Sequence, residues 1–338
     1  MASRLQDVIL RGLASARPVA TTVAAGTLYY STDVPTTDRS NGSAWETYAD
    51  TGAAGATVFS AVAQGRLTLE SGVPVSTSDQ TAKTTIYFTP YYGNHISIYS
   101  GTAWVDFAFT ERSLALGTLV SGKNYDVFIY SSAGTPTLEF SAAWTNDTTR
   151  ADALVLQDGV YVKSGATTRR YLGTFRTTST TTTEDSIVNR FVFNAINRVP
   201  RRMSAVDTTD SWTYSTAAFR QANANTANQL NYVAGLIDTY VEVTVLAGVS
   251  TSVITSRANV GVGVNSTTVN SAPIRIAFAW ASSSTTNPAS AHFRGYSGSI
   301  GYQFLAWLET GIGSGTQTWY GDNGVTEPQS GIIGEVIS

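Results

Sequence analysis

Short β-prone runs separated by turn residues constrain this chain more than any other feature. Threonine, valine and aromatic residues gather in short runs, and glycine, asparagine, serine and proline lie between them. β-Branched and aromatic side chains favour strands, whereas Gly, Asn, Ser and Pro favour tight turns. Only 13% of the residues are charged, against about 25% in ordinary soluble domains. The pattern predicts an all-β protein of many short strands, with a surface that is polar through hydroxyl groups.

One strand–turn–strand motif occurs three times in the N-terminal half. It begins as TLYYSTDVPTTDRSNGSAWE at residues 27–46, and imperfect copies follow at 85–105 and 124–144. A tryptophan preceded by alanine closes each copy: Trp45, Trp104 and Trp144. Intervals of 59 and 40 residues are too irregular for a solenoid or a propeller. The copies therefore predict separate small β-hairpin modules with different insertions.

The first copy concentrates aromatic residues around polar turns, which is typical of either a binding site or a structural unit. Its recurrence favours the structural interpretation. Aromatic pairs across neighbouring strands stabilise a hairpin, so Tyr29, Tyr30 and Trp45 are expected to hold this module together. Asn41 and Gly42 suit the turn between its strands. Modules this small bury little surface alone, which favours association of identical chains.

A short N-terminal helix is predicted from a stripe of apolar residues at helical spacing, with Ser3 and Gln6 as a capping box. Pro18 limits its extent. A helix of about ten residues is marginal alone in water, so the stripe needs a partner. That partner is either the rest of its own domain, or another protein or copies of this chain. The stripe, assigned here as the anchoring residues, consists of Leu5, Val8, Ile9 and Leu13.

A second helix is predicted over residues 181–202, joining the β modules to the C-terminal region. Thr183 suits its N-cap, and Pro200 would end it. Its apolar side is formed by Ile187, Val188, Phe191, Ala195, Ile196 and Val199.

The remaining residues predict longer antiparallel strands. YVEVTVLAGV alternates valine with Glu242 and Thr244, which is typical of a half-buried strand. PIRIAFAW places Ile274, Ile276, Phe278 and Trp280 on one face, and GYQFLAWLET is apolar on both faces. Turn-rich segments separate these runs, so the region predicts a jelly-roll-like antiparallel sandwich.

These patterns together predict an ordered series of regions along the chain. The predicted regions are an N-terminal anchor segment (1–20), three β modules (21–55, 56–112 and 113–180), the linking helix (181–202) and the C-terminal sandwich (203–338).

The sequence carries no motif for catalysis, metal binding or a cofactor, and we expect none of these. There are no cysteines and only two histidines. A net charge of −3, with 21 Lys and Arg spread thinly, gives no basic surface for nucleic acid. No apolar run is long enough to suggest a membrane helix or a signal peptide. A pair of carboxylates could serve a glycosidase, with Asp207, Asp210 and Glu309 as candidates, but Asp207 and Asp210 resemble turn or cap residues.

Aromatic residues beside turns are the other candidates for binding, because planar rings flanked by hydroxyl and amide groups stack on sugars. Two stretches, TPYYGNH and QTWYGDNG, have this character. Aromatics in such positions also close the end of a sandwich core, so both interpretations stay open. The candidate glycan contacts are Trp319 and Tyr320 in the second stretch, preferred here, and Tyr91 and Tyr92 in the first.

The opening motif also resembles a known family. AAGTLYYSTD with RSNGSAWE is similar to a repeat near the N-terminus of many tailed-bacteriophage virion proteins, in which a G-x-L-Y-Y/F-x-T-D strand pairs with x-N-G-x-x-W. GRLTLESGVPVSTSD, TEDSIVNRFVFNAINRVPRRM with DTTDSWTYSTAAFRQANANTANQL, and TWYGDNGVTEPQSGIIGEV resemble segments of phage structural proteins. The resemblance covers most of the chain in pieces and transfers no catalytic residue.

The resemblance implies a fibre, spike or decoration protein of the virion, synthesised in the host cytoplasm. Such appendages are usually three-fold symmetric, so a homotrimer is expected. Its N-terminal region would contact capsid, portal or tail proteins, and the C-terminal sandwich would project. Two other functions stay open: a receptor-binding module for host surface glycans, and, less favoured, a polysaccharide-degrading spike.

Overall fold

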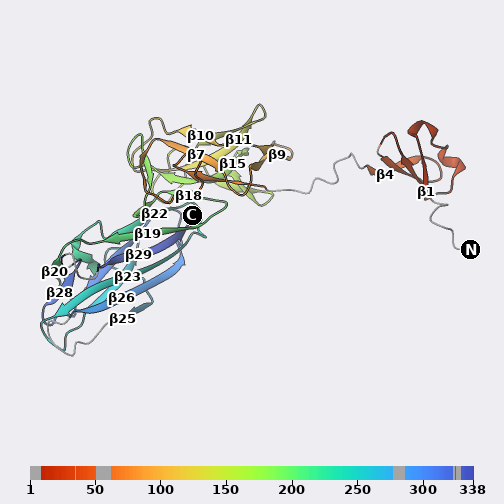
Figure 1. The fold of residues 1–338 in the computed structure, drawn as a ribbon. Coiled ribbons are helices and arrows are strands. Elements are labelled where there is room, and N and C mark those ends of the chain that lie inside the picture. The colour runs from red at the N-terminus through yellow and green to blue at the C-terminus, as the bar shows by residue number, and fades with distance from the viewer. Residues whose placement is uncertain (1–8, 35, 51–61, 277–285, 323, 325–328) are drawn as a thin grey trace, which may run out of the picture. The chain divides into compact units, whose positions relative to one another are not determined.

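The computed structural model describes residues 9–34, 36–50, 62–276, 286–322, 324 and 329–338. The chain divides into two compact units, residues 1–60 and residues 61–338, called here the N-terminal unit and the body (Figure 1). Within the described ranges the regular structure consists of strands and short 3-10 turns, without an α-helix. This confirms the prediction of an all-β protein. No helix in the described part of the chain is long and apolar enough to cross a membrane.

The N-terminal unit is built on one sheet with the strand order β1-β2-β3-β4. Strand β1 runs parallel to β2, and the other neighbours are antiparallel. Two 3-10 turns, η2 (Ala14–Ala16) and η3 (Ala20–Thr22), lie between β1 and β2. The strands are β1 (Ile9–Gly12), β2 (Leu28–Ser31), β3 (Thr36–Ser40) and β4 (Trp45–Asp50).

The predicted N-terminal helix is wrong where the structure describes it. Ile9 belongs to strand β1, and Leu13 lies just after that strand, while Leu5 and Val8 lie outside the described residues. The helical spacing covered too few residues to nucleate a helix on its own. Pairing with β2 instead satisfies the backbone of this segment through long-range hydrogen bonds. Gly12 permits the close approach, since a Cβ there would lie 2.5 Å from the Tyr29 hydroxyl.

The turn predicted for the first motif is present, and so is the aromatic contact, but Tyr29 and Trp45 lie on β2 and β4 with β3 between them and so do not pair across neighbouring strands as predicted. The rings of Tyr29 and Trp45 meet edge to face with centroids 5.9 Å apart. The Asn41 side chain accepts hydrogen bonds from the backbone N–H groups of Ser43 (2.9 Å) and Ala44 (2.8 Å). Tyr30 differs from the prediction, because its side chain is exposed.

The first part of the body packs two small sheets against a larger one (Figure 1). One apolar core runs through all three and includes Ile86, Ile98 and Val127. The small sheets contain β5 (Gly65–Thr68), β7 (Thr85–Pro90) and β10 (Arg112–Ala115), and β8 (His95–Tyr99) with β9 (Trp104–Ala108). The larger sheet contains β11 (Asn124–Ser132), β12 (Thr135–Phe140), β13 (Leu154–Gln157), β14 (Val160–Lys163), β15 (Ala166–Arg176) and β18 (Val192–Asn194).

The second part of the body encloses another apolar core between two sheets. The first of these sheets also includes two strands from the first part of the body, β6 and β16. Its strands are β6 (Gln80–Lys83), β16 (Thr183–Asp185), β17 (Asn189–Arg190), β21 (Arg220–Gln221), β22 (Gln229–Ala234), β24 (Asn259–Val264) and β27 (Gly301–Thr310). The facing sheet contains β19 (Pro200–Val206), β20 (Ser211–Thr213), β23 (Tyr240–Thr251), β25 (Ile274–Ile276), β26 (Asn287–Tyr296), β28 (Gln317–Tyr320) and β29 (Gly331–Ile337).

The predicted helix over residues 181–202 is also wrong. This segment forms β16, β17, β18 and the start of β19, in three different sheets. Phe191, Val192 and Phe193 are all buried in succession, which a helix with one apolar side cannot achieve. A strand packed on both faces can bury consecutive residues. Long-range pairing with β15, β22 and β29 therefore overrides the helical spacing.

The long C-terminal strands agree with the sequence. Strand β23 buries its alternating valines Val241, Val243 and Val245, while Glu242 and Thr244 are partly exposed. Strand β27 is buried on both faces over its second half. The PIRIAFAW stretch differs in part, since Ile274 is exposed. Phe278 and Trp280 lie outside the described residues, and so does the side chain of Ile276.

Candidate functional site

The preferred glycan contact, Trp319, is corrected by the structure. Its side chain is 0% exposed and belongs to the apolar core of the second part of the body. Its indole N–H donates a 3.1 Å hydrogen bond to the backbone carbonyl of Tyr214. Neighbouring Tyr320 is partly buried and hydrogen-bonded to Ser250 at 3.0 Å. A ring enclosed in this way closes the core and cannot stack on a sugar.

The less favoured pair, Tyr91 and Tyr92, does lie at the surface. Tyr92 is 79% exposed in the turn between β7 and β8. The two rings lie with centroids 4.0 Å apart, and the Tyr91 hydroxyl donates a 3.0 Å hydrogen bond to that of Tyr92. This hydrogen bond raises the pKa of Tyr91. The guanidinium of Arg66 lies 5.7 Å from the centre of the Tyr91 ring, so Tyr91 contacts both Arg66 and Tyr92, while most of the Tyr92 side chain remains exposed.

The backbone of this turn holds Tyr92 outward in an unfavourable conformation. Tyr92 has a φ of +57°, a region that bulky L-residues rarely occupy and that costs roughly 1–2 kcal/mol. Gly93 is packed so closely that a Cβ would lie 2.3 Å from the Gln64 side chain. The Gln64 side chain also accepts a 3.0 Å hydrogen bond from the His95 backbone N–H. Strain of this kind is concentrated at functional sites, so the Tyr91–Tyr92 pair is a candidate binding platform.

The carboxylates considered for a glycosidase are held as structural acceptors. Glu309 is 0% exposed and accepts hydrogen bonds from the Trp212 indole (2.7 Å), the Arg220 guanidinium (2.8 Å) and the Asn223 backbone N–H (3.1 Å). Asp207 is buried and accepts from the Asn228 amide at 2.6 Å. Asp210 accepts a 3.1 Å hydrogen bond from the Gly324 backbone.

The pKa values of the two buried carboxyls shift in opposite directions. Burial raises the pKa of Glu309, against the lowering effect of Trp212 and Arg220. Burial also acts to raise the pKa of Asp207, but hydrogen bonds from Asn228, Thr209 and Asn223 outweigh it and lower that pKa. Asn223 links the pair, because its backbone bonds Glu309 and its side chain bonds Asp207 at 3.2 Å. Glu309 and Asp207 thus hold the loop around Asn223 in place through hydrogen bonds inside the protein.

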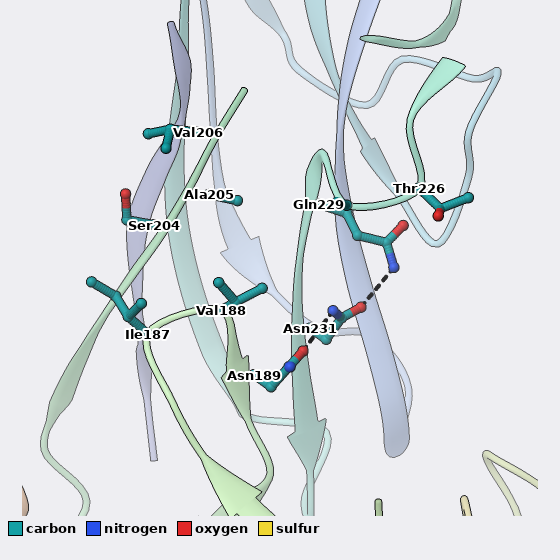
Figure 2. Close-up of a pocket in the computed structure, with 10 residues that line it drawn as sticks. Ile187, Val188, Asn189, Ser204, Ala205, Val206, Thr226, Gln229 and Asn231 are labelled. Carbon is teal, nitrogen blue, oxygen red and sulfur yellow. Dashed lines mark hydrogen bonds between the residues drawn. The ribbon is translucent and has the colours of Figure 1, made fainter. Parts of the chain in front are cut away.

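A groove of about 570 Å³ lies in the body, between β19 and β22 (Figure 2). Ser204, Ala205 and Val206 of β19 line one side, and Gln229 and Asn231 of β22 line the other. The remaining lining residues are Ile187, Val188, Asn189, Thr226 and Ala227. The lining carries no charged side chain.

A ladder of hydrogen-bonded side-chain amides follows one side of this groove (Figure 2). Gln229 donates to Asn231 at 2.7 Å, and Asn231 donates to Asn189 at 2.7 Å. Gln221 begins the ladder by donating to Gln229 at 3.1 Å, and Asn189 ends it by donating to the Glu184 carboxylate. Sequence reasoning missed this ladder. The signal was the alternation of amides in NQLNYV, but the partners Asn189 and Glu184 lie far away in sequence.

The N-terminal unit exposes several large apolar side chains, and two of them share one face of its sheet. Among its described residues only Ala20 and Tyr29 are buried apolar side chains. Register places Ile9 and Tyr30 on the sheet face opposite Tyr29, because Ile9 pairs with Leu28 and side chains alternate along β2. The exposed large apolar residues of this unit are Ile9, Leu13, Val19, Tyr30, Val34 and Tyr48. Of the predicted anchoring residues, Ile9 and Leu13 are thus exposed.

Comparison with known proteins identifies no family. No family model and no curated protein matches the sequence. Among solved structures, the chain is similar to the VP2 subviral particle of infectious bursal disease virus, with 14% identity, a TM-score of 0.27 and coverage of 82% of this chain and 73% of that one. A structure of the Gx strain of the same virus gives 12% identity, a TM-score of 0.22 and coverage of 78% and 76%. Likeness at this level carries no argument about fold or function.

Proposed function

We propose that this protein is a structural component of a bacteriophage virion: a homotrimeric fibre or spike, on the tail or the head, attached through its N-terminal unit. The resemblance of the LYYSTD and SNGSAW segments to phage virion repeats suggests this class. In this proposal the N-terminal unit contacts capsid, portal or tail proteins, and the body projects from the particle. Attachment is the function of the exposed apolar residues described above, of which Ile9 and Tyr30 share one face of the sheet.

The observation that carries the proposal is the imbalance between buried and exposed apolar residues in the N-terminal unit. A unit of about 60 residues is marginal even with a full core. Here the buried apolar side chains among the described residues are Ala20 and Tyr29, whereas Ile9, Val19 and Tyr48 are exposed. Burying one such side chain contributes roughly 1.5–3 kcal/mol. A partner that covers this surface therefore supplies stability that the unit cannot provide for itself.

Particle incorporation tests the proposal directly. Deleting residues 1–20 is unsuitable, because it removes strand β1 and the buried Ala20. The sharper variant is Ile9→Asp with Tyr30→Asp. It places charge on the face of the N-terminal sheet opposite Tyr29 and leaves Tyr29 unchanged. We expect this variant to be absent from purified particles. The matched control is Ile237→Asp with Val269→Asp, two exposed apolar positions of the body, which should be incorporated normally. Normal incorporation of the Ile9/Tyr30 variant would contradict the proposal.

A second candidate function is recognition of host surface glycans through Tyr91 and Tyr92. The strained, exposed ring of Tyr92 is the observation that favours it. Binding of the full-length protein to a glycan array should disappear with Tyr92→Asn and persist with Tyr296→Asn, which removes another exposed tyrosine. Equal binding by both variants would exclude this site. A protein without glycan binding would retain only the architectural role.

A further inference from the structure

The groove of Figure 2 places an open strand edge opposite a row of amide side chains. We propose that it binds an extended, uncharged peptide strand from another protein chain. This function goes beyond attachment to the particle and beyond glycan recognition. It uses neither the sheet face that carries Ile9 and Tyr30 nor the ring of Tyr92.

The hydrogen-bond pattern of β19 shows which backbone groups face the groove. Asp207 donates its N–H to Ser330 of the neighbouring chain segment at 3.4 Å, and Val199 and Ser338 exchange hydrogen bonds of 3.0 and 3.1 Å. Pairing between β19 and β29 is antiparallel, so bonded and non-bonded positions alternate. Odd-numbered residues of β19 therefore bond β29, and even-numbered residues point to the opposite edge.

This opposite edge is open at its C-terminal end. The Ser204 N–H is used, since it donates to the Ile187 carbonyl at 3.0 Å. The next groups along the same edge are the Ser204 carbonyl and the N–H and carbonyl of Val206, which have no hydrogen-bond partner within the described residues. Unpaired groups at a strand edge are a template for an added strand.

The amide ladder fixes the orientation of the groups on the other side. Glu184, when ionised, can only accept, so Asn189 must present its NH₂ group to it, and each amide further along is oriented in turn. Gln229, Asn231 and Asn189 each use one N–H within the ladder and keep a second one, whereas Gln221 donates its second N–H to the Asn228 carbonyl at 3.4 Å. The Asn231 oxygen is fully used, because it accepts from both Gln229 and the Tyr302 hydroxyl (2.7 Å). The ladder therefore offers the groove mainly N–H donors, in fixed positions.

The spacing of these donors matches an extended peptide. Gln229 and Asn231 are two residues apart on β22, which is about 6.8 Å along a strand. A peptide laid along the groove repeats its carbonyl groups on one side with the same two-residue period. Its other edge would meet the open edge of β19 at Val206. Such a strand would be held from both sides.

The lining also selects the chemistry of the peptide. Ile187, Val188 and Val206 provide aliphatic contacts, and no charged side chain lines the groove. A charged residue placed there would lose hydration without gaining an ion pair. No aromatic ring lines the groove for stacking on a sugar. The favoured ligand is thus a peptide with small or β-branched uncharged side chains.

Selection from a random nonapeptide library against the full-length protein tests this inference. Peptides that also bind the Val206→Pro variant are removed, because proline deletes the backbone N–H of Val206, which is unpaired within the described residues, and leaves the β29 pairing intact. Enriched peptides should be uncharged and rich in Val, Thr and Ile. Their Kd, measured by fluorescence anisotropy, should weaken about tenfold with Val206→Pro, as expected for one shielded hydrogen bond. Val206→Ala keeps the N–H and should change the Kd by less than about threefold.

Three results would overturn the proposal. The library could yield no peptide whose binding depends on the groove, or the enriched peptides could bind Val206→Pro as tightly as the wild type. The third is binding of a neutral glycan that Gln229→Ala abolishes. If Val206→Pro does not fold, as judged by its thermal unfolding midpoint, Gln229→Ala replaces it in the selection because it leaves the backbone unchanged. Incorporation of these variants into particles is measured separately. Normal incorporation combined with loss of peptide binding would separate this inference from the proposed function.

Discussion

The N-terminal unit and the body differ in how they use the same kind of sequence. Both are rich in threonine, serine and short aromatic runs. The body encloses two apolar cores and surrounds its buried charges with hydrogen bonds. The N-terminal unit buries few apolar residues, and its ion pair joins a buried Asp38 to an Arg17 side chain that is 33% exposed. The body therefore has two apolar cores of its own to stabilise it, whereas the proposed function assigns the N-terminal unit a partner that covers its exposed apolar residues.

The largest expected effect concerns the buried ion pair of the body. Asp126 is fully buried and accepts hydrogen bonds from Arg150 (2.9 Å), Trp144 (3.2 Å) and Thr174 (2.6 Å). Asp126→Ala leaves the Arg150 guanidinium buried without its partner, which should lower the free energy of unfolding by about 3–5 kcal/mol. Urea denaturation of the full-length protein measures this change.

The matched variant in the N-terminal unit is Asp38→Ala. The Arg17 side chain in this pair is 33% exposed, so water can solvate its guanidinium once the carboxylate is removed. Asp38→Ala should therefore lower the free energy of unfolding by about 1 kcal/mol or less. An equal loss in the free energy of unfolding for Asp126→Ala and Asp38→Ala would contradict this contrast between a fully buried and a partly solvated ion pair.

The next effect is confined to the N-terminal unit. Tyr29 packs against Trp45 and donates a 2.8 Å hydrogen bond to the Leu13 carbonyl. Replacing a large buried aromatic residue by alanine costs about 3–5 kcal/mol in a well-packed core and less where few neighbours are lost. In a unit with so small a core, Tyr29→Ala should unfold residues 9–50 and leave the body unchanged.

Hydrogen–deuterium exchange distinguishes the two regions in this variant. Amides of the N-terminal unit should lose protection, while those of β23 and β27 keep theirs. Tyr29→Phe loses only one hydrogen bond, about 1 kcal/mol, and should retain most of the protection. A Tyr29→Ala protein with a protected N-terminal unit would mean that other contacts hold this unit together.

The sequence predicted best those elements whose signal is local. Alternating valines define β23, and the Asn41-Gly42 turn follows from the chemistry of its two residues. The helix over residues 181–202 failed because its apolar spacing also suits strands buried on both faces. Only pairing with strands distant in sequence decides between the two structures.

The candidate sites were harder to predict for a related reason. Trp319 and Tyr92 both lie beside turns rich in glycine and asparagine, and nothing local indicates that one ring is buried and the other exposed. The amide ladder depends on Asn189 and Glu184, which the fold brings beside Asn231 from about 40 residues away. Burial and long-range hydrogen bonds are properties of the assembled sheets, so the sequence alone could not supply them.

A smaller effect should appear in the pH dependence of stability. The pKa of Asp207 is lowered in the folded body by hydrogen bonds that outweigh the effect of burial, so its ionised form stabilises the fold above the unfolded pKa of about 3.9. This contribution is lost as the pH falls through the lower, folded pKa. Asp207→Asn should therefore cost about 1–2 kcal/mol at pH 7, and the difference from the wild type should shrink below about pH 4. A constant difference from pH 7 to pH 3 would contradict this assignment.

Asp33 provides the comparison in the N-terminal unit. A hydrogen bond from the Ala14 backbone N–H, at 2.7 Å, lowers the pKa of Asp33. Its side chain is in water, so Asp33→Asn should show a pH dependence of the same sign but smaller than that of Asp207→Asn. Thermal unfolding of both variants between pH 3 and pH 7 measures the two effects.

The smallest expected change in stability is at Tyr92, and its sign differs from the others. Asparagine tolerates a positive φ better than tyrosine does, and the exposed ring contributes little burial. Tyr92→Asn should leave the free energy of unfolding unchanged or raise it by up to about 1 kcal/mol. Such a gain would show that the body accepts local strain to expose this ring, whereas the N-terminal unit exposes its apolar residues without strain of this kind at Ile9 or Tyr30. A loss of more than about 1 kcal/mol would instead assign Tyr92 a structural role.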